Sequence, residues 1–440
     1  MRRHGIQGII WRFAIALSVC HLAPVAADDG VTIEVTGGAY SGLPISIVPF
    51  SISGGPAEAV QPADIIESNL RSSGRFEVIP REQHLSRPDS LDAVNYRDWR
   101  LIKSEALVIG DVVNIGNNRY EVRFRLIDVF SETQLVGQKF VVPTSKMRKA
   151  AHQISDVIYE KLTGRPGAFN TRIAFVDVRD GDAGQTYRLQ VADSDGWDPK
   201  TILESTRPIL SPTWSPDGDR MAYVSFEQNK AIIFVQDIWT GDREPLAEFK
   251  GLNSAPAWSP DGKKLALTLS KDGNPEVYVY DTDTGFTRRI TRHPAIDTEP
   301  AWSPDGRTLI FSSGRAGGPQ IYRVSADGGE PKRLTFEGSY NAGASFSPDG
   351  RQIVLITNQG NGYKVGLYSL NERRMKELTT TAQDESPSFS PNGDMVIYAT
   401  AVGNRTMLAT VAINGQAQQF LRHYGVVARE PAWSPIPRNR

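Results

Sequence analysis

The chain has 440 residues, of which 40% are apolar and 22% are charged, with 49 basic and 50 acidic side chains. This length allows more than one domain. No basic run stands out, whereas a nucleic-acid binder needs Lys and Arg clustered on one element, and no basic amphipathic helix of the membrane-surface type is present. We therefore expect no nucleic-acid partner and no direct insertion into a membrane.

The first 27 residues have the pattern of a cleaved signal peptide. Arg2, Arg3 and Arg12 come without any acid, followed by an apolar run over 13–23 and small residues at 25–27. Cleavage after Ala27 removes the only cysteine and leaves 46 basic against 50 acidic residues, a net charge of −4. We expect an exported chain without an intramolecular disulfide. No later segment approaches the about 20 apolar residues that span a bilayer.

Residues 28–164 have the rhythm of a small α/β domain. Apolar periodicity predicts helices and strands, and the last helix should stop at Gly164 with Pro166 just beyond. The predicted helices are 62–72, 96–104 and 145–162, and the predicted strands are 31–35, 44–50, 76–79, 106–113, 120–129 and 134–142. Residues 165–170 are expected to form a linker.

A short phrase, aromatic–Ser–Pro, recurs six times after this region, at spacings of 44, 44, 44, 43 and 44 residues. A period of about 40–45 residues is typical of the four-stranded blades of a propeller. Asp-Gly directly follows the proline in most copies, and Asp-Gly between β-rich runs is a hairpin signal. The aromatic residues of the phrase are Trp214, Trp258, Trp302, Phe346, Phe389 and Trp433.

The two ends of the repeat region complete one another. The sixth phrase has only five residues after Pro435, whereas residues 171–206 supply three strands (172–178, 187–193 and 200–205) with no phrase before them. Joining the two ends makes a sixth blade and removes free sheet edges. The sequence therefore predicts an all-β six-bladed β-propeller over 171–435, closed by the C-terminal strand, with a tail at 436–440.

The repeated phrase itself is expected to be structural. Its aromatic residues should pack between blades, and the repeated Asp217, Asp261, Asp305 and Asp349 precede glycine as turn residues do. The first strand of a blade lines the central channel, so residues just before each phrase should crowd around one channel mouth. They mix charges, amides and hydroxyls, which suits a polar protein interface. For any single acid among them, a role in satisfying neighbouring backbone amides stays open. These candidate rim residues are Arg207, Asn253, Ser254, Thr298, Glu299, Tyr340, Asn341, Asp384, Glu385, Arg429 and Glu430.

Enzyme classes find little support in the residues. A propeller peptidase needs a Gly-x-Ser-x-Gly elbow, which is missing from the sequence. A lyase or glycosidase with acids, His or Arg in the channel remains the alternative. A sugar binder would need exposed channel aromatics, for which Tyr340 is the one rim candidate. We expect no cofactor, and a channel calcium ion stays open without a spacing that specifies it.

Several phrases together carry a family resemblance. They are Val48-Pro49-Phe50, Ser73-Gly74-Arg75-Phe76, Leu162-Thr163-Gly164, Gly167-Ala168-Phe169 and the PAWSPDG-type repeats. In this order, across essentially the whole mature chain, the sequence resembles the TolB family, periplasmic components of the Tol-Pal system of Gram-negative bacteria. The repeat phrase alone is only moderately specific.

The resemblance implies a monomeric, non-enzymatic periplasmic protein that binds other proteins. The propeller would bind the peptidoglycan-associated lipoprotein Pal, and the mature N-terminus would bind TolA. The system supports outer-membrane invagination at division and envelope integrity. Thr298-Glu299-Pro300 matches the family's loop best, which ranks Glu299 first on the rim. The candidate TolA segment is Asp28, Asp29, Gly30, Val31, Thr32 and Ile33, which can add as a strand to a partner's sheet or form an ordinary first strand of the α/β domain.

Overall fold

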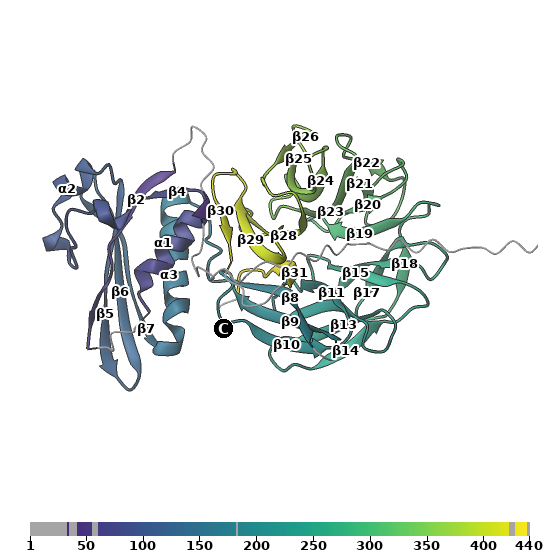
Figure 1. Ribbon diagram of the computed structural model, residues 1–440, viewed down its shortest axis with the longest axis horizontal. Coiled ribbons are helices and arrows are strands. Elements are labelled where there is room, and N and C mark those ends of the chain that lie inside the picture. Colours follow the sequence, from purple (N-terminus) through teal and green to yellow (C-terminus); the bar gives the residue numbers. More distant parts are fainter. Residues whose placement is uncertain (1–32, 35–41, 55–59, 182–183, 422–426, 438–440) are drawn as a thin grey trace, which may run out of the picture. The chain divides into compact units, whose positions relative to one another are not determined.

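A mixed sheet with helices packed on it forms the N-terminal part of the structure (Figure 1). The computed structural model describes residues 33–34, 42–54, 60–181, 184–421 and 427–437. The strands of this sheet are β2 (Leu43–Ile47), β3 (Ser51–Ser53), β4 (Phe76–Val78), β5 (Ala106–Gly116), β6 (Arg119–Asp128) and β7 (Thr133–Pro143). Their order is β4-β2-β5-β6-β7, with β3 paired to β5. β2 runs parallel to β4 and β5, and β5, β6 and β7 form an antiparallel meander.

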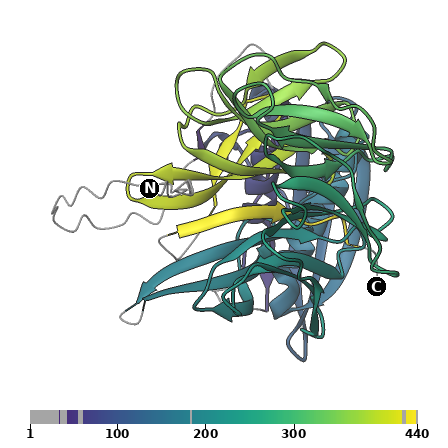
Figure 2. The same cartoon turned by 90° about the vertical axis from the view of Figure 1, so that its right-hand side faces the viewer.

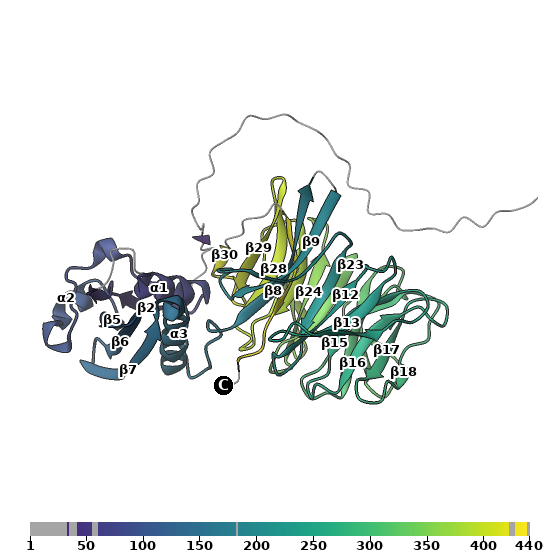
Figure 3. The same ribbon diagram turned by 90° about the horizontal axis from the view of Figure 1, so that it is seen from below.

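Local sequence signals set the helix ends. α1 (Pro62–Ser72) has proline in its first turn and is capped by the Gln61 side chain, which accepts from Ala63 N at 3.4 Å. α3 (Met147–Thr163) ends at Gly164, whose φ of +71° favours glycine. α1 and α3 lie side by side on one face of the sheet (Figure 3), and α2 (Tyr96–Leu101) buries Trp99 against residues of the other face. Short 3₁₀ turns are η1 (Arg81–Gln83), η2 (Leu91–Ala93) and η3 (Thr144–Lys146).

These elements confirm the predicted helices, with small differences at the ends. The helix over 62–72 is as predicted. The second begins at Tyr96 as predicted but stops at Leu101, because Lys103 takes a φ of +61° that a helix cannot contain. The third begins at Met147, after the turn η3.

Four separate four-stranded antiparallel sheets follow along the chain. The first holds β11 (Ile209–Trp214), β12 (Arg220–Ser225), β13 (Ile232–Asp237) and β14 (Arg243–Ala247). The second holds β15 (Asn253–Trp258), β16 (Lys264–Leu269), β17 (Glu276–Asp281) and β18 (Thr287–Arg289). The third holds β19 (Asp297–Trp302), β20 (Thr308–Ser313), β21 (Gln320–Ser325) and β22 (Lys332–Arg333). The fourth holds β23 (Tyr340–Phe346), β24 (Gln352–Asn358), β25 (Lys364–Ser369) and β26 (Arg374–Glu377).

A nine-stranded sheet supplies the other two blades and one extra strand. One blade holds β27 (Asp384–Phe389), β28 (Met395–Val402), β29 (Arg405–Ala412) and β30 (Gln418–Phe420). The other holds β31 (Val427–Trp433), β8 (Arg172–Gly181), β9 (Gly184–Asp193) and β10 (Lys200–Ser205). A single parallel pair, Thr406 with Val427, joins them, so the described strands form six four-stranded blades. The extra strand is β1 (Ile33–Glu34).

The C-terminal strand closes the ring as predicted. β31 pairs antiparallel with β8, with Trp433 opposite Ile173, and Figures 1 and 2 show this yellow strand among the teal ones. Each inner strand, the one that ends in the aromatic phrase, contacts the inner strand of the next blade. β31 contacts both β27 and β11, so the circle has no gap.

The repeated phrase acts in packing and in turns, as predicted. Trp258 lies in a core cluster that joins two neighbouring blades, and the indole N–H of Trp302 donates to the carbonyl of Ala257 in the preceding blade at 3.1 Å. In the turn after Trp258, Asp261 Oδ1 accepts from Ser259 Oγ at 2.5 Å and from Lys263 N at 3.1 Å. The aspartate thus holds a tight turn together.

The α/β layer and the ring share one hydrophobic core. Tyr159 of α3, Met395 of β28 and Trp433 of β31 belong to the same buried cluster. Residues Thr32–Arg440 form a single compact unit, so the predicted boundaries at 164, 170 and 435 remain predictions.

The short strand β1 corrects one alternative for the mature N-terminus. Ile33 pairs with Gln419 and Glu34 with Gln418, on the outer edge of the blade that ends in β30. β1 is therefore not a strand of the α/β sheet. The predicted signal peptide and the predicted TolA residues Asp28, Asp29, Gly30, Val31 and Thr32 lie outside the described residues.

Candidate functional site

Every inner strand of the ring contains an irregularity at the same place. Its register with the second strand shifts, and one residue there takes a positive φ between +46° and +62°. Only one of these residues is a glycine, so the fold imposes a backbone that the others disfavour. A bulge also re-aims the side chain that it carries. These bulge residues are Ser211, Ala255, Glu299, Gly343, Ser386 and Glu430.

Two bulge residues are glutamates, and they lie three blades apart, on opposite sides of the ring. Glu299 Oε2 accepts from Gly343 N at 2.9 Å and from Ser312 Oγ at 2.7 Å. Glu430 Oε2 accepts in the same way from Ser211 N. Each carboxylate therefore binds the bulge amide of the next blade and joins two inner strands.

The environment of Glu430 changes its proton affinity. Burial raises the pKa of Glu430 to about 7, and the negative charges of Glu385 and Glu299 act in the same direction, while the Ser211 amide and Arg429 oppose them. The upward shift places a carboxyl group that changes charge near neutral pH in the wall of the channel.

An ion pair crosses between two further blades. The guanidinium of Arg429 binds both carboxylate oxygens of Glu385, at 2.8 and 2.9 Å, and these hydrogen bonds raise the pKa of Arg429. The side chains are 50% and 33% exposed. This bidentate pair presents a charged but internally paired surface.

Apolar side chains lie just ahead of the inner strands, where each strand begins. Ile296 is 52% exposed and Phe336 is 70% exposed, and Leu252 is also exposed. Tyr363 is exposed in the loop between β24 and β25, at the same end of its blade. Tyr363 meets Tyr340 edge-to-face, with ring centroids 5.0 Å apart. We call this end of the channel, with the loops between the second and third strands, the channel mouth. It offers apolar surface beside polar groups, as protein interfaces do.

Three predicted rim residues do not lie on the mouth. Asn253, Asn341 and Asp384 are at most 4% exposed. The Asn253 amide donates to the carbonyls of Ala231 and Phe249, at 3.1 and 2.7 Å. Asn341 and Asp384 bond their own blades or the neighbouring blade in similar fashion. The expectation that these three crowd around the mouth is wrong, because the residue two positions before each of these bulges points into the blade.

The other predicted rim residues keep at least part of their surface. Arg207, Glu299 and Arg429 are exposed, and the remaining ones are partly exposed. Thr298 Oγ1 lies 3.4 Å from Thr268 Oγ1 in the blade before it. The structure thus brings together Ser254, Thr298, Glu299, Tyr340, Glu385, Arg429 and Glu430 on inner strands, with Arg207 in the loop before β11.

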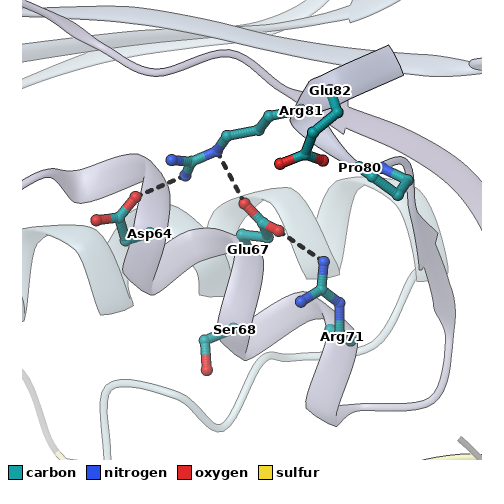
Figure 4. A pocket seen from close by; sticks show the side chains of 7 residues that line it. All are labelled: Asp64, Glu67, Ser68, Arg71, Pro80, Arg81 and Glu82. Carbon is teal, nitrogen blue, oxygen red and sulfur yellow. Dashed lines mark hydrogen bonds and ion pairs between the residues drawn. The ribbon is translucent and has the colours of Figure 1, made fainter. Parts of the chain in front are cut away.

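A polar pocket on α1 shows a different arrangement (Figure 4). Arg81 bridges Asp64 at 2.7 Å and Glu67 at 3.0 Å, and Arg71 binds Glu67 at 2.6 Å. Pro80, Ser68 and Glu82 complete the lining. Because its arginines are all paired with carboxylates, this pocket offers no free charge for an anionic ligand.

Comparisons with known proteins place both halves of the chain. Residues 31–135 match the model of the TolB amino-terminal domain, and residues 159–437 match that of the TolB beta propeller domain. The chain belongs to the TolB family. "Tol-Pal system protein TolB" of Nitrosococcus oceani is 58% identical over 423 residues, covering 96% of this chain and 97% of the relative. The protein of that name from Methylobacillus flagellatus is 58% identical over 416 residues, covering 94% and 95%.

A solved structure agrees with this assignment. The crystal structure of TolB from Acinetobacter baumannii matches with a TM-score of 0.83 and 41% identity, covering 92% of this chain and 100% of that chain. As a TolB-family member the chain is a component of the Tol-Pal system, and protein partners within that system follow. Across the described residues we find no helix with the length and apolarity needed to cross a bilayer.

Sequence reasoning missed the bulges and the apolar part of the mouth. The sequence carries a weak signal for the bulges, since five of the six bulge residues come directly before a proline at the repeat spacing and the sixth, Gly343, comes before Ala344. A residue before proline normally takes an extended backbone, so the pattern alone points the wrong way. Exposed Ile296 and Phe336 lie in loops, where the spacing of apolar residues does not predict which side chains are exposed.

Proposed function

We propose that this TolB-family chain is a periplasmic, non-catalytic protein that binds Pal through the channel mouth. Membership of the TolB family supports a role in the Tol-Pal system, and the surface of the channel mouth supports that end of the ring as the binding site. Glu299, held by Gly343 N and Ser312 Oγ, keeps a fixed carboxylate on β19, while exposed Ile296 directly precedes that strand and exposed Phe336 lies in the loop before β23. A rigid polar group beside apolar anchors is the arrangement that gives an interface its affinity and register.

The Pal proposal is tested by direct binding to the mature chain. Glu299→Arg reverses the charge and removes two hydrogen bonds at the mouth, so the affinity for the soluble domain of Pal should fall at least about tenfold. The matched control is Glu330→Arg, the same change on an exposed residue between β21 and β22 of the same blade, at the end away from the mouth. A melting temperature within about 2 °C of wild type qualifies each variant, with Thr298→Arg replacing a variant that misfolds. Equal Pal affinity for mouth and control variants would overturn the proposal.

We further propose that the mature N-terminus, Asp28–Ile33, binds TolA. Pairing of Ile33 with Gln419 supports it, because a segment that adds to one exposed strand edge has the chemistry to add to another. Removing residues 28–33 should abolish capture of TolA and leave Pal capture in place. Unchanged TolA capture by the truncated chain contradicts this part alone. The same truncation should leave cells sensitive to detergent and slow to constrict the outer membrane at division.

The second candidate is a channel enzyme of the lyase or glycosidase class. Glu299 and Glu430 on opposite walls, with the pKa of Glu430 raised to about 7, are the observation that favours it. Both carboxylates are already engaged by backbone amides of the next blade, which favours a joining role. Turnover of an acidic polysaccharide by wild type, lost in Glu430→Gln and retained in the Glu330→Arg control, would replace the binding proposal.

A further inference from the structure

A buried histidine of α3 faces a turn of the ring. His152 is 2% exposed, and its Nδ1 lies 2.9 Å from Asn69 Nδ2 of α1. Its Nε2 has no hydrogen-bond partner among the described residues, and Asp195 Oδ2 lies 3.7 Å away. A buried polar atom without a partner is rare in native structures and calls for an explanation.

The turn after β9 holds two carboxylates toward this nitrogen. Backbone bonds close the turn, with Asp193 N donating to Trp197 O at 3.0 Å and Trp197 N donating to Asp195 Oδ1 at 3.1 Å. Ser194 Oγ donates to Phe169 O at 2.6 Å and fixes the turn beside α3. One ligand atom each from His152, Asp193 and Asp195 lies within 4.8 Å of the others. The three residues thus converge from two segments of the chain, helix α3 and the turn after β9.

Two of the three ligand groups have no partner of their own. Within the described residues the Asp193 carboxylate has no hydrogen bond or ion pair, and His152 Nε2 has no hydrogen-bond partner, whereas Arg148 pairs with Asp195. An unpaired carboxylate close to an unpaired, buried imidazole nitrogen leaves both groups available to a cation.

We propose that His152 Nε2, Asp193 and Asp195 bind a divalent transition-metal ion of the Zn²⁺ class. One imidazole and two carboxylates form a three-ligand set that Zn²⁺ accepts, with water in the fourth position. Ca²⁺ and Mg²⁺ fit less well, because they prefer all-oxygen ligands in larger number. Asn69 Nδ2 lies 2.9 Å from the other ring nitrogen, Nδ1. Metal binding at Nε2 places the ring proton on Nδ1, so the Asn69 amide would turn its oxygen to this nitrogen and accept that proton.

The ion would join α3 to the blade that closes the ring. It is independent of Pal or TolA binding, since none of its ligands lies at the channel mouth or in residues 28–33. Arg148 competes for Asp195, and it is 20% exposed and stacked 4.7 Å over Trp197. Removing that positive charge should strengthen metal binding, which distinguishes a metal site from a merely structural histidine.

The test is Zn²⁺ titration of the mature chain, stripped with chelator and followed by calorimetry and metal analysis. We expect one ion per chain, at least about tenfold weaker binding in His152→Gln and in Asp193→Asn, and several-fold tighter binding in Arg148→Gln. His84→Gln, the same change on another histidine of the α/β layer, should bind as wild type does. Co²⁺ should give a visible absorption band in wild type that His152→Gln lacks.

The variants test the metal site even if one of them does not fold. Melting temperatures in chelator show which variants fold. Asp193→Asn carries the test if His152→Gln does not fold, because the Asp193 side chain makes no hydrogen bond or ion pair to any residue that the structure describes. Absence of stoichiometric Zn²⁺ binding, or equal affinity in wild type, Asp193→Asn and Arg148→Gln, would overturn the proposal.

Discussion

One aspartate, Asp394, joins the α/β layer to the ring. Its side chain is 1% exposed and accepts from Arg75 at 2.7 Å, Arg165 at 2.7 Å and the Tyr159 hydroxyl at 2.5 Å. Tyr159 lies in α3 and Asp394 lies in the turn before β28. Replacing Asp394 by Asn removes the charge that all three donors share, while keeping the volume. We predict that this change lowers stability by weakening the contact between the α/β layer and the ring.

The magnitude follows from burial. Removing one partner of a buried ion pair costs about 3–5 kcal/mol, and hydrogen bonds to charged groups contribute about 1.5–3 kcal/mol each. Arg75 and Arg165 are 38% and 43% exposed and regain water when released. Asn also keeps one acceptor oxygen. We therefore expect Asp394→Asn to lower the free energy of unfolding by about 3 kcal/mol.

Differential scanning calorimetry of the mature chain measures this loss. If about 400 residues melt together, about 3 kcal/mol lowers the melting temperature by roughly 3–4 °C, since unfolding entropy is about 2.1 cal/mol/K per residue. If the α/β layer of roughly 130 residues separates, its own transition falls by about 10 °C and the single peak splits.

The matched control is Asp219→Asn, the equivalent position one residue past the Pro-Asp-Gly turn of another blade. Asp219 accepts from the exposed Trp239 indole at 2.9 Å, so its change should cost less than about 1 kcal/mol. Equal losses in the two variants would refute the reasoning. So would a loss at Asp394 that persists in an Arg75→Ala, Arg165→Ala background, where its cation partners are gone.

Three further predictions concern titration, packing and closure. Burial raises the pKa of Asp156 to about 6 although its carboxylate accepts from Phe169 N and Asn170 N. A raised folded pKa gives stability that is present below the unfolded value near 4 and lost as pH rises through 6. Wild type should therefore lose up to ~3 kcal/mol relative to Asp156→Asn between pH 4 and 7 in urea unfolding, and a pH-independent difference would contradict this. Trp302→Phe should lower the free energy of unfolding by about 1 kcal/mol more than Trp258→Phe does. The reason is that the Trp302 indole donates to Ala257 O, whereas the buried Trp258 N–H has no acceptor among the described residues. Equal shifts in melting temperature would argue against this prediction. Deleting 427–440 should abolish the cooperative melting transition, while deleting 436–440 should leave it unchanged, and a normal transition without β31 would show that closure is dispensable.

The blades could be predicted from the sequence because their signals are local and repeated. Pro-Asp-Gly turns and β-rich runs return at about 44 residues, and each copy supports the others. Closure was also accessible, since the unmatched phrase at Trp433 and the unmatched strands after Thr171 complete a single blade. The α/β elements followed from ordinary caps such as Pro62 and Gly164.

The site was harder because its geometry depends on one bulge per blade. The bulge at Glu299 changes which side chains meet the channel, so residues before the phrase could not be sorted into buried Asn253 and accessible Thr298. The joint at Asp394 binds Arg75 across 319 positions of sequence, and no periodicity reports such a contact. The same holds for His152 and the turn at Asp193.

β31 is the innermost strand of the blade that also holds β8, β9 and β10, so the parts of that blade are synthesised far apart in time. Roughly 250 residues separate Gly181 from Val427, which corresponds to roughly 10–50 s if they emerge at about 5–20 residues per second. During that interval the edge of β8 that later pairs with β31 has unpaired amide and carbonyl groups, to which another extended chain could bind. A chaperone that covers this edge of β8 would therefore protect the chain from aggregation mainly before β31 is made, because β31 covers the edge afterwards.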